Sequence, residues 1–462
     1  MLLIRMLDTE SMGAYFIAFI VTALLVLLSD FGVDIALVKK YPEKDEGEQT
    51  ALLRSAVIWR FFVCALVSVL YFALSTVEGV SMIRDIAHIT APVIVFYWLQ
   101  SFRALLLRAL QAQHLFDVYA GTQLLAAALK VILIAALFVA GTDSVAIVLW
   151  CECATFFASI VYALARMQLR IGKPAPPSLG DALELLRFGF PLYLNALVNL
   201  GNERAAGYVV AGLGGPVAMA YFGVAERLAD AGRRLFDPFG NVYLPAQTKY
   251  FADGDIAAAK EFANRSLLWV TFIVAGGTIA FAVIREPVIG LLFTQKYISV
   301  ADTAVFFMCA LVLRCIQVLL GYFGVAAGFN YMPVKVSLLS SVIGIALILL
   351  FFTWYGYQGA VIALVITQAM IGTMYVIGLH RGGVSLDITP VVVLLSGFAA
   401  ALSWILPFDH LWFVAAGAPL FFLVFSLMFV PTLRSDLAIV FDKVRRNGLA
   451  ERVRQQTAKF DR

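Results

Sequence analysis

The chain has 462 residues, of which 62% are hydrophobic and only 14% are charged, and its formal net charge is +4. A soluble protein would carry about 25% charged residues, so this composition argues against a soluble enzyme, and so small a net charge gives no sign of nucleic-acid binding. Apolar stretches of about 20 residues, each long enough to cross a bilayer, recur almost without pause. We therefore predict an all-α, polytopic membrane protein, because a membrane β-barrel would need short alternating segments instead.

Hydropathy predicts about thirteen membrane spans along the chain. In chain order they are approximately Met12–Val38, Leu53–Leu74, Ile83–Leu107, Val118–Ala140, Ser144–Ala165, Leu186–Ala211, Val217–Tyr243, Leu267–Ile284, Ala301–Ala327, Val334–Trp354, Gly359–Leu379, Thr389–Leu406 and Leu411–Val430.

Basic residues are concentrated in alternate loops, which sets the expected orientation. One set of loops contains Lys39, Lys40, Lys44, Arg108, Arg170, Lys173, Lys249, Lys260 and Arg381, and the opposite set holds only Arg5, Arg84, Arg285 and Lys296. The first set and the basic C-terminal tail are therefore predicted to be cytoplasmic. The tail from Thr432 onward is typical of a short amphipathic helix on the membrane surface.

Two parts of the chain repeat the same order of residues, which indicates an internal repeat in one orientation. The aligned pairs are Tyr15 with Tyr221, Tyr41 with Tyr250, and Arg54-Ser55 with Arg265-Ser266. The alternative is chance similarity between two aromatic-rich helices.

The Pro- and Gly-rich segment at residues 172–180 is the one clear linker, and it divides the chain into two predicted lobes. We assign residues 1–178 to an N-lobe, 179–380 to a C-lobe, 381–431 to two extra C-terminal helices and 432–462 to the cytoplasmic tail. A full span precedes Met219, whereas only a short fragment precedes Met12. The repeat therefore predicts an ancestral design of about fourteen spans, of which the first is truncated or its start codon is misplaced.

Several charged residues lie inside predicted spans, where a charge costs about 2.5–3.5 kcal/mol on insertion scales. The cations come from both lobes and are Arg60, Lys130, Arg204, Arg227 and Arg314. Fewer acids lie at similar depth, namely Glu152, Glu203 and Glu226. If the cations converge on one cavity, that cavity attracts an anion such as a diphosphate, because arginine binds phosphate oxygens in bidentate fashion. Alternatively, these cations only reach toward the membrane surface or bind carbonyl groups.

The span Leu186–Ala211 carries a polar stripe. Asn195, Asn199 and Asn202 follow one another at helical spacing, and Glu203 lies beside them. These amides line a cavity for sugar-like groups, or they make hydrogen bonds between helices without a substrate. Glu203 and Glu226 each lie close to an arginine, so we predict a coupling role for them; a fixed ion pair is the alternative.

The sequence contains no catalytic constellation and no phosphate-binding loop of the Gly-x-x-x-x-Gly-Lys type, so we expect no enzyme activity and no ATPase on this chain. No cofactor and no metal site are expected. The five cysteines lie in apolar runs and are predicted to be buried free thiols.

The stretch Tyr15–Val38, which includes Ser29-Asp30-Phe31-Gly32-Val33-Asp34, resembles the second-helix signature of the polysaccharide transporter family. The similarity continues over residues 220–227 and 286–301 and covers nearly the whole chain. This family comprises O-antigen and lipid-linked oligosaccharide flippases of the multidrug/oligosaccharidyl-lipid/polysaccharide exporter superfamily.

The resemblance implies two six-helix lobes around a cationic cavity, which work by alternating access. Its cargo would be an undecaprenyl-diphosphate oligosaccharide, moved across the bacterial inner membrane for surface polysaccharide or lipopolysaccharide biosynthesis. The partners implied are this lipid-linked oligosaccharide, membrane lipid, and glycan polymerase or ligase machinery. A cation-coupled drug antiporter of the same fold and a membrane-embedded glycan polymerase are the alternatives; an excess of Arg and Lys argues against the first, and the lack of a long extracytoplasmic loop argues against the second.

Overall fold

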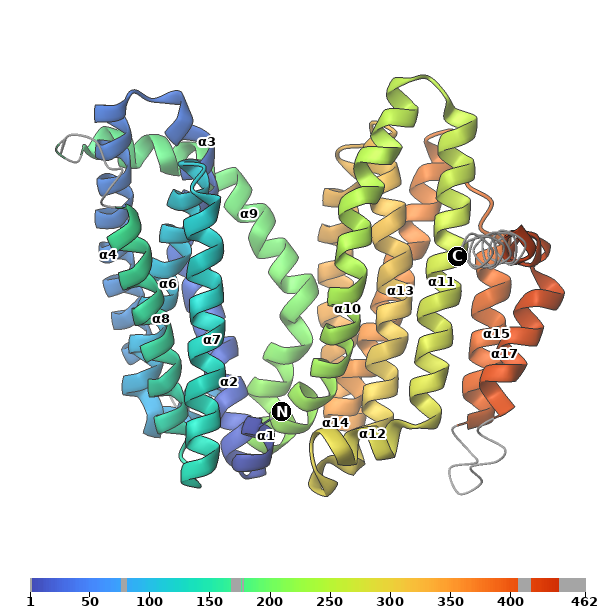
Figure 1. The fold of residues 1–462 in the computed structure, drawn as a ribbon, viewed down its shortest axis with the longest axis horizontal. Coiled ribbons are helices and arrows are strands. Elements are labelled where there is room, and N and C mark those ends of the chain that lie inside the picture. The colour runs from blue at the N-terminus through green and yellow to red at the C-terminus, as the bar shows by residue number, and fades with distance from the viewer. Residues whose placement is uncertain (1, 76–80, 168–175, 177, 406–416, 440–462) are drawn as a thin grey trace, which may run out of the picture. The chain divides into compact units, whose positions relative to one another are not determined.

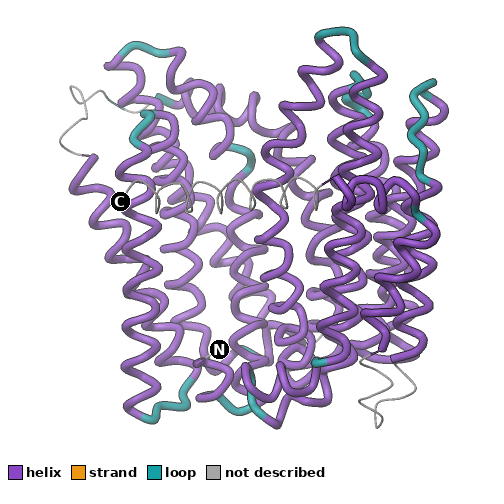
Figure 2. Tube along the Cα trace, turned by 45° about the vertical axis from the view of Figure 1, so that its right-hand side comes forward, coloured by secondary structure: helices purple, strands orange, loops and turns teal. Residues whose placement is uncertain are grey.

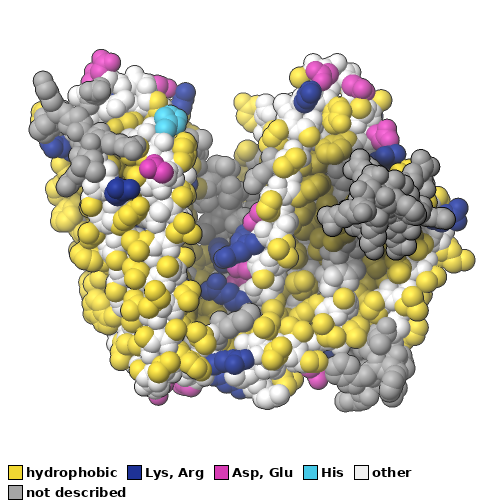
Figure 3. Space-filling model, in the orientation of Figure 1, with side chains coloured by type: hydrophobic (Ala, Val, Ile, Leu, Met, Phe, Trp, Pro, Cys, Tyr) yellow, Lys and Arg dark blue, Asp and Glu magenta, His cyan; other side chains and the backbone are white. Residues whose placement is uncertain are grey.

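The computed structural model describes residues 2–75, 81–167, 176, 178–405 and 417–439. Helices joined by short loops make up nearly all of this described part, which contains no strand (Figure 2). Hydrophobic side chains cover most of the visible surface over helices α7 (Phe116–Ala140) and α8 (Val145–Met167) (Figure 3). The prediction of an all-α membrane protein is confirmed.

Nine helices in the described residues are long and apolar enough to cross a membrane, or ten if one bent pair near the C-terminus counts as a span. Within the described residues, every one of the thirteen predicted segments nevertheless overlaps with a helix. The segment Met12–Val38 covers two helices, Thr9–Asp30 and Val33–Lys40, and residues 411–416 of the last segment lie outside the described part. The difference arises because one 50-residue helix holds two predicted spans, because α15 (Thr389–Ile405) is short, and because α9 (Leu179–Val209) is not among those nine.

By its internal contacts the chain forms two compact units, each described here by itself. Unit 1 contains residues 1–227, 289–300 and 337–364, and unit 2 contains residues 228–288, 301–336 and 365–462. The predicted lobe boundaries lie at other positions and stay a prediction. Residues 172–175 and 177 of the predicted linker lie outside the described residues, as does the tail beyond residue 439, whereas residues 179 and 180 already belong to the helix Leu179–Val209.

Unit 1 is built on long helices that pack side by side (Figure 1). Its helices are α1 (Leu2–Met6), α2 (Thr9–Asp30), α3 (Val33–Lys40), α4 (Glu46–Ser75), α5 (Ser81–Asp85), α6 (Thr90–Ala112), α7, α8 and α9, followed by a π-helical turn (Val210–Gly214). Helix α8 packs against both α6 and α7, and α2 packs against α6. One apolar core of this unit joins α3, α4, α6 and α9.

A sharp corner separates α2 from α3. Phe31 and Gly32 both adopt left-handed backbone conformations there, with φ of 50° and 80°. A Cβ atom on Gly32 would lie 2.1 Å from the carbonyl oxygen of Gly189 in α9, so the two backbones are in direct contact. Only glycine fits at this corner, because it combines a positive φ with this close approach.

Ion pairs hold the other end of α3 against the start of α9. The ammonium of Lys44 lies 2.9 Å from the Glu184 carboxylate, and that of Lys40 lies 3.6 Å from it. The hydrogen bond from Lys44 lowers the pKa of the Glu184 carboxyl group below its usual value. This exposed cluster contributes little free energy, but it fixes which turn of α9 meets the loop after α3.

Unit 2 contains α11 (Ile256–Val283), α13 (Ala301–Ala326), α15 and α17 (Gly417–Phe429). Helix α11 packs against α13 and α15, and α15 packs against α17. Leu268, Ile279, Leu394, Phe398 and Phe422 belong to the shared apolar core of these helices.

Three helices contribute residues to both units. They are α10 (Gly215–Ala252), α12 (Arg285–Leu292) and α14 (Met332–Arg381). Helix α14 is interrupted at Gly356, whose φ of 59° and ψ of −141° are not helical. This break confirms the predicted boundary between the spans Val334–Trp354 and Gly359–Leu379. Helix α10 continues through Pro238 and Pro245.

Candidate substrate site

The first half of α2 presents an aromatic stripe to two of the predicted cations. Phe16 and Phe19 are one helical turn apart and therefore lie on the same side of α2. The guanidinium of Arg227 lies 5.4 Å from the ring centre of Phe16, and the ammonium of Lys130 lies 5.5 Å from that of Phe19. A cation over an aromatic face is attracted by the ring quadrupole, more strongly when it is shielded from water. The two cations Lys130 and Arg227 therefore lie over neighbouring turns of α2.

Lys130 also forms an ion pair with Glu152 of the adjacent helix. Its Nζ lies 2.5 Å from Glu152 Oε1, and the hydroxyl of Tyr15 donates a 2.9 Å hydrogen bond to the same oxygen. Glu152 is only 2% exposed, whereas the side chain of Lys130 is 39% exposed. Glu152 Oε2 is buried and has no hydrogen-bond partner among the described groups. The carboxylate is thus enclosed, while the lysine side chain is partly exposed.

Arg204 and Arg227 lie close to the same part of unit 1. Arg204 Nη1 is 3.4 Å from Glu226 Oε1, and both side chains are partly exposed. Arg227 follows Glu226 directly and is exposed. Among the described side chains, no carboxylate lies within ion-pair distance of Arg227. Arg227 is therefore an exposed cation without an acidic partner among the described side chains.

Arg60 has a different environment, because its side chain is fully buried. Its Nη2 lies 2.9 Å from Asp30 Oδ1 and 2.5 Å from Asp34 Oδ1, and its Nη1 donates a 3.2 Å hydrogen bond to Ser101 Oγ. Asp30 and Asp34 flank the Phe31–Gly32 corner, so Arg60 joins α4 to both helices that meet there. A substrate group can reach Arg60 only if these carboxylates move.

The five predicted cations are divided between the units. Arg60, Lys130, Arg204 and Arg227 belong to unit 1, and the half-buried Arg314 belongs to α13 of unit 2. The convergence of all five on one cavity stays a prediction. Asn195, Asn199, Asn202 and Glu203 lie on α9, but their side chains are outside the part of the structure that is described.

Three of the predicted cations have acidic partners, and two of these acids, Glu152 and Glu226, are among those expected at this depth. Glu152 and Glu226 pair with Lys130 and Arg204, and Arg60 has two acidic partners that sequence reasoning missed. Asp30 and Asp34 are four residues apart, a spacing that repeats on one helix face. Both aspartates lie inside the predicted span Met12–Val38, so this spacing was the signal that could have found them.

The described residues contain no group of three or more His, Cys, Asp or Glu side chains that could hold a metal ion. All five cysteines are free, as predicted; Cys64, Cys153 and Cys315 are buried, and Cys151 and Cys309 are partly buried.

Comparisons with known proteins agree with this architecture. Residues 1–251 match the family profile described as "Polysaccharide biosynthesis protein". No curated protein matches the chain in sequence. Among solved structures, a lipid II flippase MurJ in an inward closed conformation has a TM-score of 0.73 at 16% identity, over 93% of this chain and 94% of that chain.

Two other solved structures extend the similarity. An inward-facing multidrug resistance MATE transporter of the MOP superfamily has a TM-score of 0.68 at 14% identity, over 82% of this chain and 92% of that chain. A MOP superfamily transporter from Pyrococcus furiosus has a TM-score of 0.53 at 14% identity, over 80% and 87%. At these identities the likeness establishes a shared fold.

Proposed function

The chain belongs to the polysaccharide biosynthesis protein family, and from this premise we propose that it flips a lipid-linked oligosaccharide across the bacterial inner membrane. The carrier would be an undecaprenyl diphosphate, moved outward by alternating access, with the C-terminus of the protein in the cytoplasm. The MOP-type fold supports a transporter, and the carrier and the direction are our proposal.

The observation that carries the proposal is the pair of accessible cations on the aromatic stripe of α2. Lys130 and Arg227 lie over Phe19 and Phe16, and Arg204 is partly exposed close by. A diphosphate headgroup is a dense anion with several acceptor oxygens, which suits arginine and lysine donors. We assign the headgroup to Lys130, Arg204 and Arg227 in unit 1.

The membrane potential provides an adequate driving force for such a cargo. A charge that crosses about 100 mV changes its free energy by about 2.3 kcal/mol. A headgroup with about two negative charges is therefore favoured outward by roughly 4–5 kcal/mol, because the cytoplasm is electrically negative. The proposed transport needs no ATP site.

The proposal is tested by restoring surface glycan in a strain that lacks its own flippase. Arg227→Gln should reduce glycan export at least about tenfold at normal protein abundance, since a hydrogen bond to a charged group contributes about 1.5–3 kcal/mol. The double substitution Lys130→Met with Glu152→Gln should have a similar effect, because it removes the cation without leaving a buried charge.

Lys39→Gln is the matched control, because Lys39 is an exposed cation paired with Glu43 outside the spans. It should export glycan normally. Normal export by both the Arg227 variant and the double variant would refute the cationic site, and drug resistance without glycan export would favour the small-molecule antiporter.

A further inference from the structure

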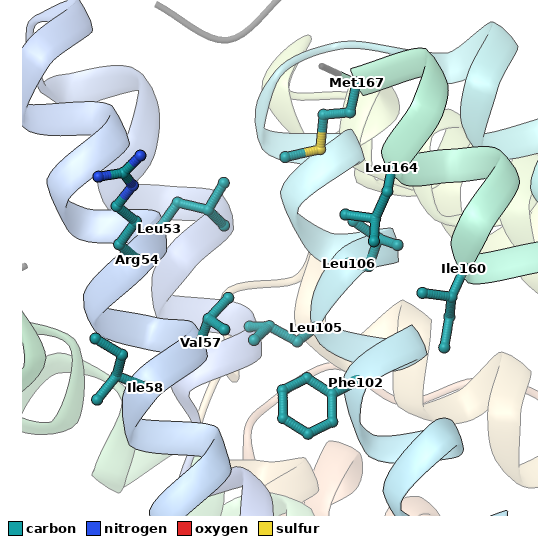
Figure 4. Close-up of a pocket in the computed structure, with 10 residues that line it drawn as sticks. All are labelled: Leu53, Arg54, Val57, Ile58, Phe102, Leu105, Leu106, Ile160, Leu164 and Met167. Carbon is teal, nitrogen blue, oxygen red and sulfur yellow. The ribbon is translucent and has the colours of Figure 1, made fainter. Parts of the chain in front are cut away.

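An apolar groove lies on unit 1 between α4, α6 and α8 (Figure 4). We call it the α4–α6–α8 groove, and its cavity measures about 530 Å³. Nine of its ten lining residues are apolar, and Arg54 is the charged one. Val57 of α4 points toward Leu105 of α6, and Leu164 of α8 and Ile58 of α4 also line the groove.

The internal repeat gives this groove a counterpart in unit 2. The shift of 211 positions that aligns Arg54 with Arg265 also aligns two groove residues of α6 with two residues of α13. Those pairs are Phe102 with Leu313 and Leu105 with Ile316, and both α13 residues line a cavity of unit 2. A shift of 212 positions aligns Ile160 with Gly372 and Leu164 with Val376, which line that same cavity.

In unit 2 this place is occupied by a membrane helix of the chain itself. Val391, Val392 and Leu395 of α15 line the cavity, which measures only about 230 Å³. Val391 is buried in a cluster that includes Leu267 and Ile316. Helix α15 therefore fills in unit 2 the position that is open in unit 1.

The same difference is visible on the helices that form the two sides. Val57 of α4 is 40% exposed, whereas its counterpart Leu268 in α11 is 3% exposed. Phe61 of α4 is 51% exposed, whereas its counterpart Phe272 stacks on Phe422 of α17. The exposed face of α4 thus corresponds to the face of α11 that α15 and α17 cover.

We propose that the α4–α6–α8 groove receives one apolar membrane-spanning helix of a second membrane protein. Helix α15 shows the chemistry that such a site accepts, with Val391, Leu394, Phe398 and Ala401 on its buried face. An acidic group at one end of the docking helix would meet Arg54. We assign the groove to a different protein; a second copy of this chain would make a heterologous contact, which closes into a ring or extends into a filament.

The test is photo-crosslinking in living cells that express the full chain. A photo-reactive phenylalanine in place of Ile58 or Leu164, both of which are exposed in the groove, should give one defined protein adduct whose cross-linked peptide maps to an apolar membrane span. A cysteine at the mapped position should then form a disulfide with Ile58→Cys. Filling the groove with Val57→Trp should abolish the adduct at Leu164 while protein abundance stays normal.

The same probe in place of Leu124 is the matched control, because Leu124 is 71% exposed on α7 and does not line the groove. It should give no defined adduct. Adducts at Ile58 and Leu164 with lipid only, with a second copy of this chain only, or with the same proteins as at Leu124 would each overturn the proposal. None of these readouts depends on transport, so the result is independent of the proposed function.

Discussion

Replacing Lys130 with methionine tests whether the Glu152 carboxylate is a buried charge held by one cation. Removal of one partner of a buried ion pair costs about 3–5 kcal/mol, because the other charge is left uncompensated. Glu152 is 2% exposed and would keep only the hydrogen bond from Tyr15. We therefore expect Lys130→Met to lower the free energy of unfolding by about 3 kcal/mol, at the lower end of that range.

The reverse substitution should be milder. Glu152→Gln leaves a lysine that is already 39% exposed and can turn toward water, so the expected loss is about 1 kcal/mol, near that of one hydrogen bond. The double variant carries no buried charge and should also lose only about 1 kcal/mol. Denaturant titration of the purified protein in detergent, followed by tryptophan fluorescence, measures all three values.

The decisive result is the difference in stability loss between Lys130→Met and Glu152→Gln. If Glu152→Gln destabilises the protein as much as Lys130→Met, or if the double variant is as unstable as Lys130→Met, then the buried Glu152 carboxylate is not a charge that Lys130 must compensate. Additive losses in the double variant would likewise show that the two side chains do not interact.

Four further predictions follow from other parts of the structure. Arg60→Met should lower the free energy of unfolding by about 3–5 kcal/mol, because two acidic partners lose their cation; the same denaturant titration measures this, and a loss below 1 kcal/mol would contradict the pairing. Gly32→Ala should lower the free energy of unfolding by about 1–3 kcal/mol. Gly47→Ala is the control and should not, because its added Cβ meets nothing within 4 Å; equal thermal stability of the two variants would contradict the requirement for glycine at position 32. Glu226→Gln should weaken glycan export and flatten its dependence on pH if that carboxylate has a coupling role; wild-type pH behaviour would remove it from the mechanism. A cysteine in place of Glu46 should resist impermeant thiol reagents in intact cells, and efficient labelling would reverse the proposed orientation.

The helices could be predicted from the sequence because length and hydropathy follow directly from the residues themselves. The interruption of α14 at Gly356 could also be predicted from the sequence, since glycines at positions 356 and 359 separate two apolar runs. Hydropathy also places Lys130 and Glu152 within neighbouring spans. It does not give the rotation of each helix, so their contact could not be deduced.

The environment of Arg60 shows where sequence reasoning ends. Its partners Asp30 and Asp34 lie on two different helices, on either side of the positive φ at Phe31 and Gly32, and both carboxylates contact one guanidinium. A sequence read by periodicity treats residues 30–34 as one continuous helix. The turn, and therefore the ion-pair network, depends on the close approach of α9 to Gly32.

The ion pair between α7 and α8 also affects how the chain enters the membrane during synthesis. Lys130 emerges from the ribosome before Glu152. It belongs to α7, and only 6% of the residues in the apolar stretch of that helix are buried in the folded protein. A lone lysine there costs about 2.5–3.5 kcal/mol, which the flanking leucine and isoleucine residues must offset at about 0.3–0.6 kcal/mol each. Once α8 arrives, the charge is matched within two consecutive helices. The α7–α8 hairpin is then the smallest segment around Lys130 that enters the bilayer without an unpaired charge.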